Sequence, residues 1–352
     1  MNLKYPQAEA LGMRFHALFS AADNPFPGPL RVDIIINPAS GVLCKKKQFL
    51  QCLDTFDNFL SDKTRRNNRI EEVRIHTTMF PRHASEISKE ILRQADSEDG
   101  TYHLILSIGG DGTHQETLEN FLFIGEKYLR RFCFFRLPMG TGNDGADAET
   151  FSQSLKILYT GRVGKKAGAV RIRPRNMHPF YAFNIASLGV DAYITFLTNK
   201  LKGVLPGDVY KIIADIATLF YEPVYKADVM RVSRGKNGEG GLLEGRFMLF
   251  AVGVSGHRSY GDHKWILPGD ENICGIERTS LKNKLKIKKL FYEGKHGLRE
   301  EVHFWKSDFL TIDYPVKVPM QMDGEAVWLG PENFPLTMEV IPPCLSILEL
   351  DN

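Results

Sequence analysis

The first half of the chain alternates short apolar runs with amphipathic stretches. The apolar runs, rich in β-branched and aromatic residues, are typical of strands: Val32–Ile36, Glu72–His76, Leu104–Ile108 and Phe132–Leu137. Helical spacing of apolar residues marks the segments near residues 45–60, 83–95 and 113–124. Strands that alternate with helices predict a parallel sheet covered on both faces. We therefore expect a Rossmann-like α/β domain over residues 30–160, preceded by an N-terminal extension at residues 1–29.

After about residue 160 the pattern changes to closely spaced strands. They are expected at Ala169–Arg173, Tyr181–Ala186, Lys226–Ser233 and Gly245–Val254, and near residues 300–305, 308–313, 316–322 and 336–349. The turn-rich segment Arg234–Gly241 predicts a hairpin. Helices are expected near residues 191–202, 208–220 and 280–292. This order predicts a second, mostly antiparallel β-rich domain over residues 161–340. The C-terminal segment, residues 341–352, is open to a return into the first domain.

The composition agrees with two globular domains, since 43% of the 352 residues are hydrophobic and 25% are charged. A net charge of +3 gives no reason to expect nucleic acid as a partner. The five cysteines are scattered and odd in number, which favours a reducing, cytoplasmic setting. No apolar run approaches the roughly 20 residues of a membrane-spanning helix, and the N-terminus does not resemble a secretory signal.

Positive charge is concentrated in one segment, Lys282–Lys289, which carries five lysines among apolar residues. Such a segment suits an anionic membrane surface, where each lysine contributes about 1 kcal/mol. A solvated helix face is the alternative explanation. Both peripheral contact with the inner membrane surface and a solvated helix face therefore remain as explanations of this segment. The sequence is also compatible with a homodimer.

The sharpest chemical signal is a glycine-rich loop, Ser107–Glu116, between a predicted strand and a predicted helix. Gly109, Gly110 and Gly112 allow close approach of the backbone, so that free N–H groups can bind phosphate oxygens. Asp111 would repel a phosphate unless it holds Mg²⁺ or accepts a proton from an attacking hydroxyl. The alternative is an ordinary tight turn, for which this sequence is also suitable.

Two more loops follow predicted parallel strands, at residues 37–41 and 138–144. Their small and polar residues are Asn37, Ser40, Gly41, Gly140, Thr141, Gly142, Asn143 and Asp144. Ligands of open α/β sheets bind at the carboxyl ends of the strands, so the three loops define one candidate cleft. Asn143 and Asp144 could instead cap the next helix.

Together, the motifs Asn37-Pro-x-Ser-Gly, Gly109-Gly-Asp-Gly-Thr-x-x-Glu116, Pro138-x-Gly-Thr-Gly-Asn-Asp144 and Asp323-Gly-Glu325 resemble those of the diacylglycerol kinase catalytic-domain family. That family includes sphingosine, ceramide and bacterial lipid kinases, and the resemblance covers roughly residues 30–350. It implies a nucleotide-binding α/β domain, a β-rich lipid-binding domain, and transfer of the γ-phosphate of ATP to a lipid hydroxyl with Mg²⁺.

The resemblance also implies roles for particular residues. Glu325 becomes the first candidate for the proton acceptor, with Asp111 and Asp323 as further catalytic carboxylates and Asp111 as a ligand of the Mg²⁺ that accompanies ATP. The nucleotide would be bound by Asn37, Thr78, Gly109, Gly110, Asp111, Gly112, Thr113, Glu116, Gly140, Thr141, Asn143 and Asp144. Without the resemblance, Asp323-Gly-Glu325 is simply a hairpin turn.

Two further positions have alternatives. Asp191 could bind a polar lipid headgroup or cap the helix that follows it. Asp270 matches the aspartate that holds a structural Mg²⁺ in some relatives, but Glu271 replaces a family glycine and Ser259–Asp262 replaces a glycine triplet. A turn aspartate explains Asp270 equally well.

Two other functions compete with the lipid kinase. NAD kinases and phosphofructokinases also use a Gly-Gly-Asp-Gly-Thr element, and their acceptors are water-soluble. A catalytically silent nucleotide-binding regulator would need only the glycine loops. The second glycine loop and the late Asp323-Gly-Glu325 favour the lipid kinase, and the acceptor lipid cannot be identified from these residues.

Overall fold

The computed structural model describes residues 6–64, 70–96, 100–140, 145–201, 228–260 and 264–350. The chain divides into two units, Met1–Ala167 with Pro343–Asn352, and Gly168–Pro342. Two long strands, β5 (Arg162–Arg173) and β18 (Leu336–Glu349), each belong partly to both units. C-terminal residues of β18 thus belong to the first unit.

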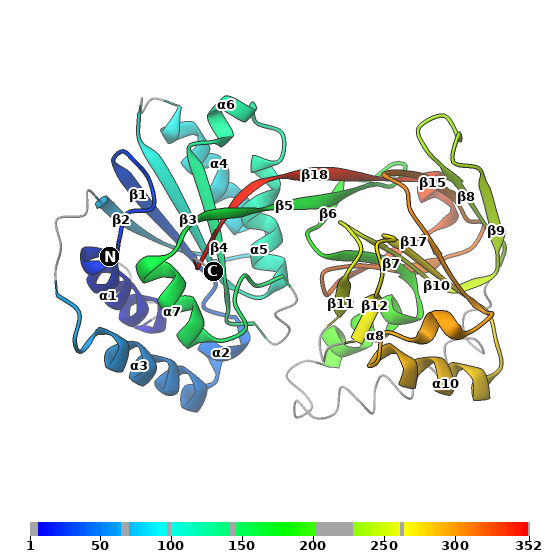
Figure 1. Ribbon diagram of the computed structural model, residues 1–352, viewed down its shortest axis with the longest axis horizontal. Coiled ribbons are helices and arrows are strands. Elements are labelled where there is room, and N and C mark those ends of the chain that lie inside the picture. Colours follow the sequence, from blue (N-terminus) through cyan, green and yellow to red (C-terminus); the bar gives the residue numbers. More distant parts are fainter. Residues whose placement is uncertain are drawn as a thin grey trace. The chain divides into compact units, whose positions relative to one another are not determined.

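The first unit is built on a parallel sheet in the order β2-β1-β3-β4 (Figure 1). Its strands are β1 (Leu30–Ile36), β2 (Ile70–Thr77), β3 (Tyr102–Gly109) and β4 (Phe132–Pro138). All four expected strands are present, with ends within about two residues of those predicted, the usual uncertainty of strand boundaries. The end of β18 adds a further parallel strand beside β4, where Ile347 pairs with Phe134.

Helices cover both faces of this sheet (Figure 1). They are α1 (Pro6–Ala21), α2 (Gly41–Cys44), α3 (Lys46–Leu60), α4 (His83–Ala95), α5 (Asp111–Leu118), α6 (Glu126–Leu129) and α7 (Phe151–Thr160), with a 3₁₀ turn at Glu119–Phe121. α1, α3 and α7 contact one another over one face, while α4 and α5 pack on the other. Strands β1, β3 and β4 are almost entirely buried between the layers, as expected for a parallel sheet, whereas the edge strand β2 is partly exposed.

The segment expected as an N-terminal extension contributes α1 to the core of the first unit. Leu11, Phe15 and Leu18 recur at helical spacing and are fully buried. Phe15 also packs edge to face on Phe56 of α3, with ring centroids 5.0 Å apart. The sequence did not indicate this helix, because the segment that follows it, residues 24–29, contains three prolines and is typical of a domain boundary.

The second unit is rich in antiparallel strands. A six-stranded sheet has the order β14-β13-β10-β7-β16-β17, and β8 pairs with β9 and β15 in a second layer. The strands are β6 (Phe180–Ala182), β7 (Ile185–Gly189), β8 (Met230–Arg234), β9 (Leu242–Gly245), β10 (Phe247–Gly253), β11 (Arg258–Tyr260), β12 (Lys264–Leu267), β13 (Ile273–Glu277), β14 (Val302–Trp305), β15 (Phe309–Asp313), β16 (Val318–Met322) and β17 (Glu325–Leu329). The helices are α8 (Val190–Leu201) and α10 (Leu281–Phe291), with 3₁₀ turns at His296–Leu298 and Pro331–Asn333.

These elements confirm the predicted fold class, an N-terminal parallel-sheet α/β region followed by a mostly antiparallel β-rich region. The hairpin predicted at Arg234–Gly241 joins β8 to β9. The single strand expected at Tyr181–Ala186 is wrong, because it is interrupted between β6 and β7. The helix expected near residues 208–220 lies outside the described residues. Among the helices that the structure describes, none is long and apolar enough to cross a membrane.

Candidate functional site

The carboxyl ends of four neighbouring strands bring several of the predicted site residues to one edge of the first unit. Asn37 follows β1 and donates its N–H to the Ile108 carbonyl at 2.9 Å. Thr78 follows β2, and its N–H donates to the Ile36 carbonyl at 2.9 Å. Because β1 lies between β2 and β3, these two bonds hold the three strand ends at one level. The edge is the place where open α/β sheets bind ligands.

The glycine loop between β3 and α5 leaves no room for a side chain at its first position. A Cβ on Gly109 would lie 2.5 Å from Thr113 Oγ1, far inside contact distance. Thr113 is fixed there, since its hydroxyl oxygen accepts a 3.0 Å bond from Asn37 Nδ2 and its N–H donates to the Gly110 carbonyl at 2.9 Å. Packing at Gly109 therefore holds Thr113 in place to contact Asn37, in the loop that follows β1.

Gly110 brings the second glycine loop close to the first. A Cβ on Gly110 would lie 3.6 Å from the Cα of Gly140, which follows β4. Gly110 is the residue before α5, where the first N–H groups of a helix have no partner within the helix. Asp111 and Gly112 form the first turn of α5, so backbone donors and the positive end of the helix dipole face this edge.

A buried hydroxyl lies on the same edge. Ser40, before α2, is only 6% exposed, and its Oγ has no hydrogen-bond partner within the part of the chain that the structure describes. Leaving a buried hydroxyl unpaired costs free energy, so the position fits a ligand oxygen. The N–H of Val42 donates to the Met139 carbonyl at 3.1 Å, which holds this segment beside the end of β4. The glycine cradle and this hydroxyl together fit the phosphates of a nucleotide.

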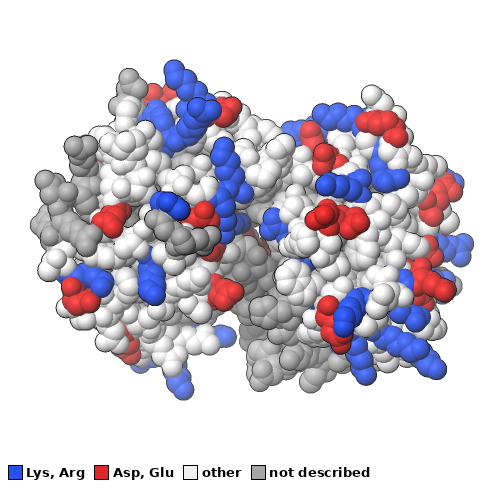
Figure 2. Space-filling view, in the orientation of Figure 1, with Lys and Arg blue, Asp and Glu red and all other residues white. Residues whose placement is uncertain are grey.

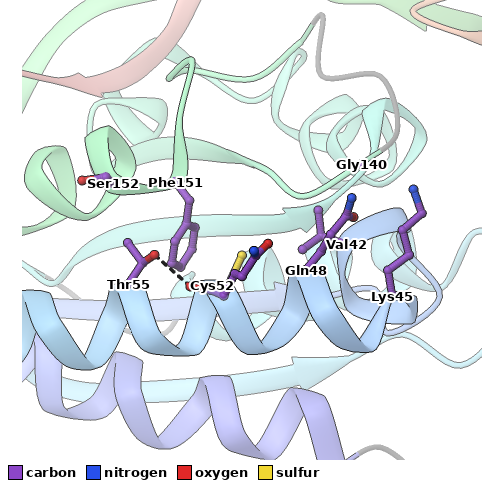
Figure 3. Close-up of a pocket in the computed structure, with 9 residues that line it drawn as sticks. Val42, Lys45, Gln48, Cys52, Thr55, Gly140, Phe151 and Ser152 are labelled. Atoms are coloured by element: carbon purple, nitrogen blue, oxygen red, sulfur yellow. Dashed lines mark hydrogen bonds between the residues drawn. The ribbon is translucent and has the colours of Figure 1, made fainter. Parts of the chain in front are cut away.

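Beside Gly140 the surface is hollowed into a groove of about 420 Å³ (Figure 3). Its walls come from the polar side of α3 and the start of α7, with Phe151 pointing toward Cys52 and Thr55. Gln48, Val42 and Lys45 lie toward the end where Gly140 is. Its volume lies within the range of small-molecule sites. No sequence pattern predicted this groove, because its residues come from separate helices.

Asp111 is oriented toward the segment that follows the second glycine loop. Its Oδ1 accepts the N–H of Gly145 at 3.0 Å. That segment is fixed by a buried ion pair between Arg136 and Asp147, with Nη2 and Oδ1 2.7 Å apart. Arg136 could have been identified from the sequence, because it is a charged residue inside the apolar strand Phe132–Pro138. Thr141, Asn143 and Asp144 lie outside the described residues.

Glu116 is bonded to the loop that carries Thr78. Its Oε1 accepts the N–H of Arg82 at 3.0 Å, next to the start of α4. Burial raises the pKa of Glu116 above its ordinary value. Arg82 has a left-handed backbone, with φ of 70°, and its guanidinium binds the buried carboxylate of Glu119. These contacts support the loop that presents Thr78, which is itself buried.

His114 lies inside the glycine-loop motif, but its ring points into the interior. It is 2% exposed, and its Nδ1 is 2.7 Å from Ser107 Oγ. Burial lowers the pKa of His114 to about 3, with a further contribution from Arg136. The ring is therefore neutral at physiological pH and cannot serve as a cation for a phosphate.

In the second unit, Asp323 and Glu325 flank a tight turn but have different surroundings. Asp323 and Gly324 form the turn between β16 and β17, with φ of 46° and 87°. The buried Asp323 carboxylate accepts backbone N–H groups from Phe183, Asn184 and Ile185, at 3.0 Å for the last two. These bonds interrupt the expected strand between β6 and β7.

Asp323 thus has both carboxylate oxygens engaged by the backbone, which suits positioning of the turn better than the catalytic role expected from the sequence. Glu325, the first residue of β17, is exposed. Asp323-Gly-Glu325 is therefore a hairpin turn, as the alternative explanation held, and the same turn also presents the Glu325 carboxylate at the surface.

Asp191 lies in the first turn of α8, within a buried polar network. Its Oδ2 accepts the Tyr260 hydroxyl at 2.6 Å and the Ser187 hydroxyl, while Oδ1 has no hydrogen-bond partner among the described residues. Gln321 Nε2 donates to Ser187 Oγ at 2.8 Å, and Gln321 Oε1 accepts the N–H of Gly324 at 3.1 Å. Burial raises the pKa of Asp191. The network therefore links Asp191 to the turn that precedes Glu325.

Asp270, the expected structural Mg²⁺ ligand, is 87% exposed and lies 2.9 Å from His257 Nε2. Within the part of the chain that the structure describes, no three His, Cys, Asp or Glu side chains gather as a metal site. A resident metal at Asp270 thus gains no support from neighbouring described side chains, and the hydrogen bond with His257 accounts for its orientation.

Comparisons with known proteins agree with this arrangement. Residues 31–163 match the model of the diacylglycerol kinase catalytic domain. The chain is 24% identical to the diacylglycerol kinase of Bacillus subtilis (strain 168) over 310 residues, which cover 86% of this chain and 92% of that protein. It is also 24% identical over 224 residues, 62% of this chain and 68% of the relative, to the protein of Shewanella frigidimarina (strain NCIMB 400) named probable lipid kinase YegS-like.

Solved structures share the fold over most of the chain. Two crystal structures of Bacillus anthracis str. Sterne proteins assigned as diacylglycerol kinases each cover 90% of this chain and 96% of their own length. Their TM-scores are 0.57 and 0.51, at 17% and 14% sequence identity. The resemblance predicted from the motifs is confirmed, since residues 31–163 match the diacylglycerol kinase catalytic domain.

Proposed function

We propose that this kinase-family protein transfers the γ-phosphate of ATP to the hydroxyl group of a lipid. The observation that carries the proposal is the glycine cradle, where Gly109 admits no side chain and Gly110 and Gly140 approach within contact distance at the start of α5. A backbone surface of this kind binds phosphate through N–H groups and the helix dipole. The family match supports the choice of a kinase over a tight turn without function.

On this proposal, the residues of the first unit bind and orient the nucleotide. Backbone N–H groups at the start of α5, with Asn37 and Thr78 beside them, hold the phosphates at the edge of the sheet. ATP supplies the phosphoryl group, and the accompanying Mg²⁺ neutralises part of its charge. Asp111 would hold that ion, because its carboxylate lies at the cradle and the Gly145 N–H orients it. Thr141, Asn143 and Asp144 are proposed to complete this nucleotide site.

The residues of the second unit handle the acceptor. Glu325 is exposed on a fixed turn, so we propose that it accepts the proton of the attacking hydroxyl. Asp323 holds that turn through backbone bonds. Asp191 has a buried carboxylate oxygen, Oδ1, without a partner among the described residues, and it can accept a hydrogen bond from a polar headgroup. No nucleophilic side chain of the protein is needed, since the lipid hydroxyl attacks.

The test is a screen of purified protein with labelled ATP and Mg²⁺ against a lipid extract, with NAD in a parallel reaction. A labelled lipid that depends on the protein supports the proposal, and phosphorylation of NAD alone contradicts it. Asp111→Asn should lose turnover by about 100-fold or more, the usual scale for a group that acts in the transition state. Asp54→Asn, an exposed carboxylate on α3, is the matched control and should keep wild-type rates.

Glu325→Gln separates the chemical step from nucleotide binding. We expect kcat to fall by about 100-fold or more, while ATP affinity stays within about twofold of wild type. Glu300→Gln, at an exposed position in the same unit, is the control. Unchanged kcat in the Glu325 variant would remove the proton-acceptor role while leaving the nucleotide site in place.

A further inference from the structure

Helix α10 combines a strongly basic composition with one buried side. Its sequence Leu281–Phe291 contains five lysines and no acidic residue. Ser280 caps the helix by accepting the Asn283 N–H. Ile287 is 3% exposed and belongs to a core cluster against which Phe291 packs. The helix is therefore anchored to the second unit by one face, and its other face is exposed where the structure describes its surroundings.

Large apolar side chains lie on that outer face. Leu281, Leu285 and Tyr292 are each 46% exposed. Their spacing of four and seven residues places them on one side of the helix. Such residues are usually buried, so three exposed together on one stripe indicate a contact surface rather than a solvated helix face.

The apolar stripe continues onto the neighbouring hairpin. Trp265 of β12 is 40% exposed, and a Cβ on Gly294 would lie 3.6 Å from Trp265 Cβ, so the chain leaving α10 passes over this residue. Lys264 Nζ lies 5.8 Å from the Tyr292 ring centroid. We call Trp265, Leu281, Leu285, Tyr292 and the exposed lysines of α10 the α10 surface.

Lysines border the stripe on its solvent side. Lys282, Lys286 and Lys289 are exposed, at spacings that place them beside Leu281, Leu285 and Tyr292. The acidic residue that follows the helix, Glu293, is paired with Lys295 at 2.9 Å. Lys and Arg side chains gather at the lower right of Figure 2, over the position of α10 in Figure 1. The surface is therefore apolar along its centre and positive along its border.

We propose that the α10 surface docks the protein onto an anionic lipid bilayer. Helices with leucine and aromatic residues on one side and lysines beside them lie in the interface plane, with the apolar groups at the headgroup boundary. Tyr and Trp favour that boundary because their rings are apolar and their tips polar. Lysines near anionic headgroups add electrostatic attraction. The exposed Leu281 and Leu285 would have no role in binding nucleic acid, because protein contacts with nucleic acid are mostly with its phosphates.

The inference adds a membrane partner to the proposed lipid kinase, but its test measures binding and needs no turnover. Full-length protein is floated with vesicles of phosphatidylcholine alone and with vesicles that also contain phosphatidylglycerol. We expect binding to the anionic vesicles only, and weaker binding as salt is raised. No binding to anionic vesicles at low salt would overturn the inference, whatever the kinase assay shows.

A triple variant, Lys282→Gln with Lys286→Gln and Lys289→Gln, should weaken partitioning about 100-fold, since each lysine near the surface contributes roughly fivefold. The matched control removes three exposed lysines of the first unit, Lys46→Gln, Lys47→Gln and Lys127→Gln. The control should bind within about threefold of wild type if the effect is local. Equal losses in both triple variants would contradict docking through α10.

The apolar half of the surface is tested by Leu281→Ser with Leu285→Ser, checked for folding by circular dichroism. Because both leucines are exposed, we expect native stability and a loss of vesicle binding of tenfold or more, at about 0.8 kcal/mol for each buried CH₂. Persistent binding would reduce the contact to charge alone and refute the proposed insertion. Concentration-dependent self-association that disappears in this variant, without vesicle binding by the wild type, would assign the surface to a protein contact and overturn the lipid assignment.

Discussion

Two neighbouring glycines of the loop before α5 give a test in which one substitution damages the fold and the other damages the ligand site. A methyl group on Gly109 would lie 2.5 Å from Thr113 Oγ1 and 2.6 Å from its Cβ. Carbon atoms in good contact are about 3.5–4.0 Å apart, so Gly109→Ala is about 1 Å too close. Overpacking of this kind costs about 1–3 kcal/mol. Displacing Thr113 also breaks its bond to Asn37, for about 1 kcal/mol more.

Gly110→Ala differs in every one of these respects. Its Cβ would lie 3.6 Å from Gly140 Cα, an ordinary contact, and its φ of −94° suits any residue. Alanine is a poorer N-cap than glycine but restricts the unfolded chain more, so the net change in stability should stay within about 1 kcal/mol. The methyl group would nevertheless occupy the space in front of the α5 N–H groups. Loss of one charge-assisted bond, at about 1.5–3 kcal/mol, weakens ATP binding about 10- to 100-fold.

The assay combines urea unfolding, followed by far-ultraviolet circular dichroism, with calorimetric titration of ATP and Mg²⁺. Tryptophan fluorescence would not report on the loop, because Trp265, Trp305 and Trp328 all belong to the second unit. Gly125→Ala is the matched control, since this glycine precedes α6 and has no atom within 4 Å of an added Cβ. Wild-type stability of Gly109→Ala would refute the packing on Thr113. Unchanged ATP affinity of Gly110→Ala would refute phosphate binding at this loop.

Two buried carboxylates predict opposite responses to pH. Burial alone would raise the pKa of Asp33, but hydrogen bonds and charge from His76 and Arg74 lower it. The ion pairs of Asp33 therefore stabilise the fold above a pH of about 4, and this stabilisation is lost as the pH falls through the folded pKa. Asp33→Asn should lower the free energy of unfolding by about 3 kcal/mol at pH 7 and flatten its acid dependence in urea titrations; an unchanged slope would contradict this. Burial raises the pKa of Asp191, so the wild type gains stability as the pH falls toward that pKa. Asp191→Asn should lose this gain in stability. The same variant should raise the KM for lipid but not the KM for ATP. Equal changes in both KM values would argue against headgroup recognition.

The fold could be predicted where the hydrophobic period was clear. Three of the four parallel strands, β1, β3 and β4, are nearly continuous apolar runs, which is the pattern of strands buried on both faces. The break between β6 and β7 could not be predicted, because it depends on a carboxylate, Asp323, more than 130 residues away in the sequence. Contacts of such separation leave no local pattern in the residues that they reshape.

The candidate site was predictable in its loops but not in its supports. Gly109 and Gly110 stand in a motif whose residue types directly reflect the need for close backbone approach. Ser40 and Arg136 gain their meaning only from burial, one as an unpaired hydroxyl and the other as the partner of Asp147. The distinction between Asp323 and Glu325 also required the structure, since both are acidic residues of one short motif.

The turn that carries Asp323 joins the two acceptor-side residues of the second unit into one rigid arrangement. Asp323 binds the backbone at Phe183, Asn184 and Ile185, where β7 begins, and β7 leads directly to Ser187 and Asp191. Gln321 completes this hydrogen-bond network, since its side chain donates to Ser187 Oγ and accepts the N–H of Gly324. Movement of the turn would therefore disturb Asp191 as well as Glu325. A buried, fully bonded aspartate therefore lies next to an exposed glutamate. The first holds the geometry, and the second is the proposed proton acceptor.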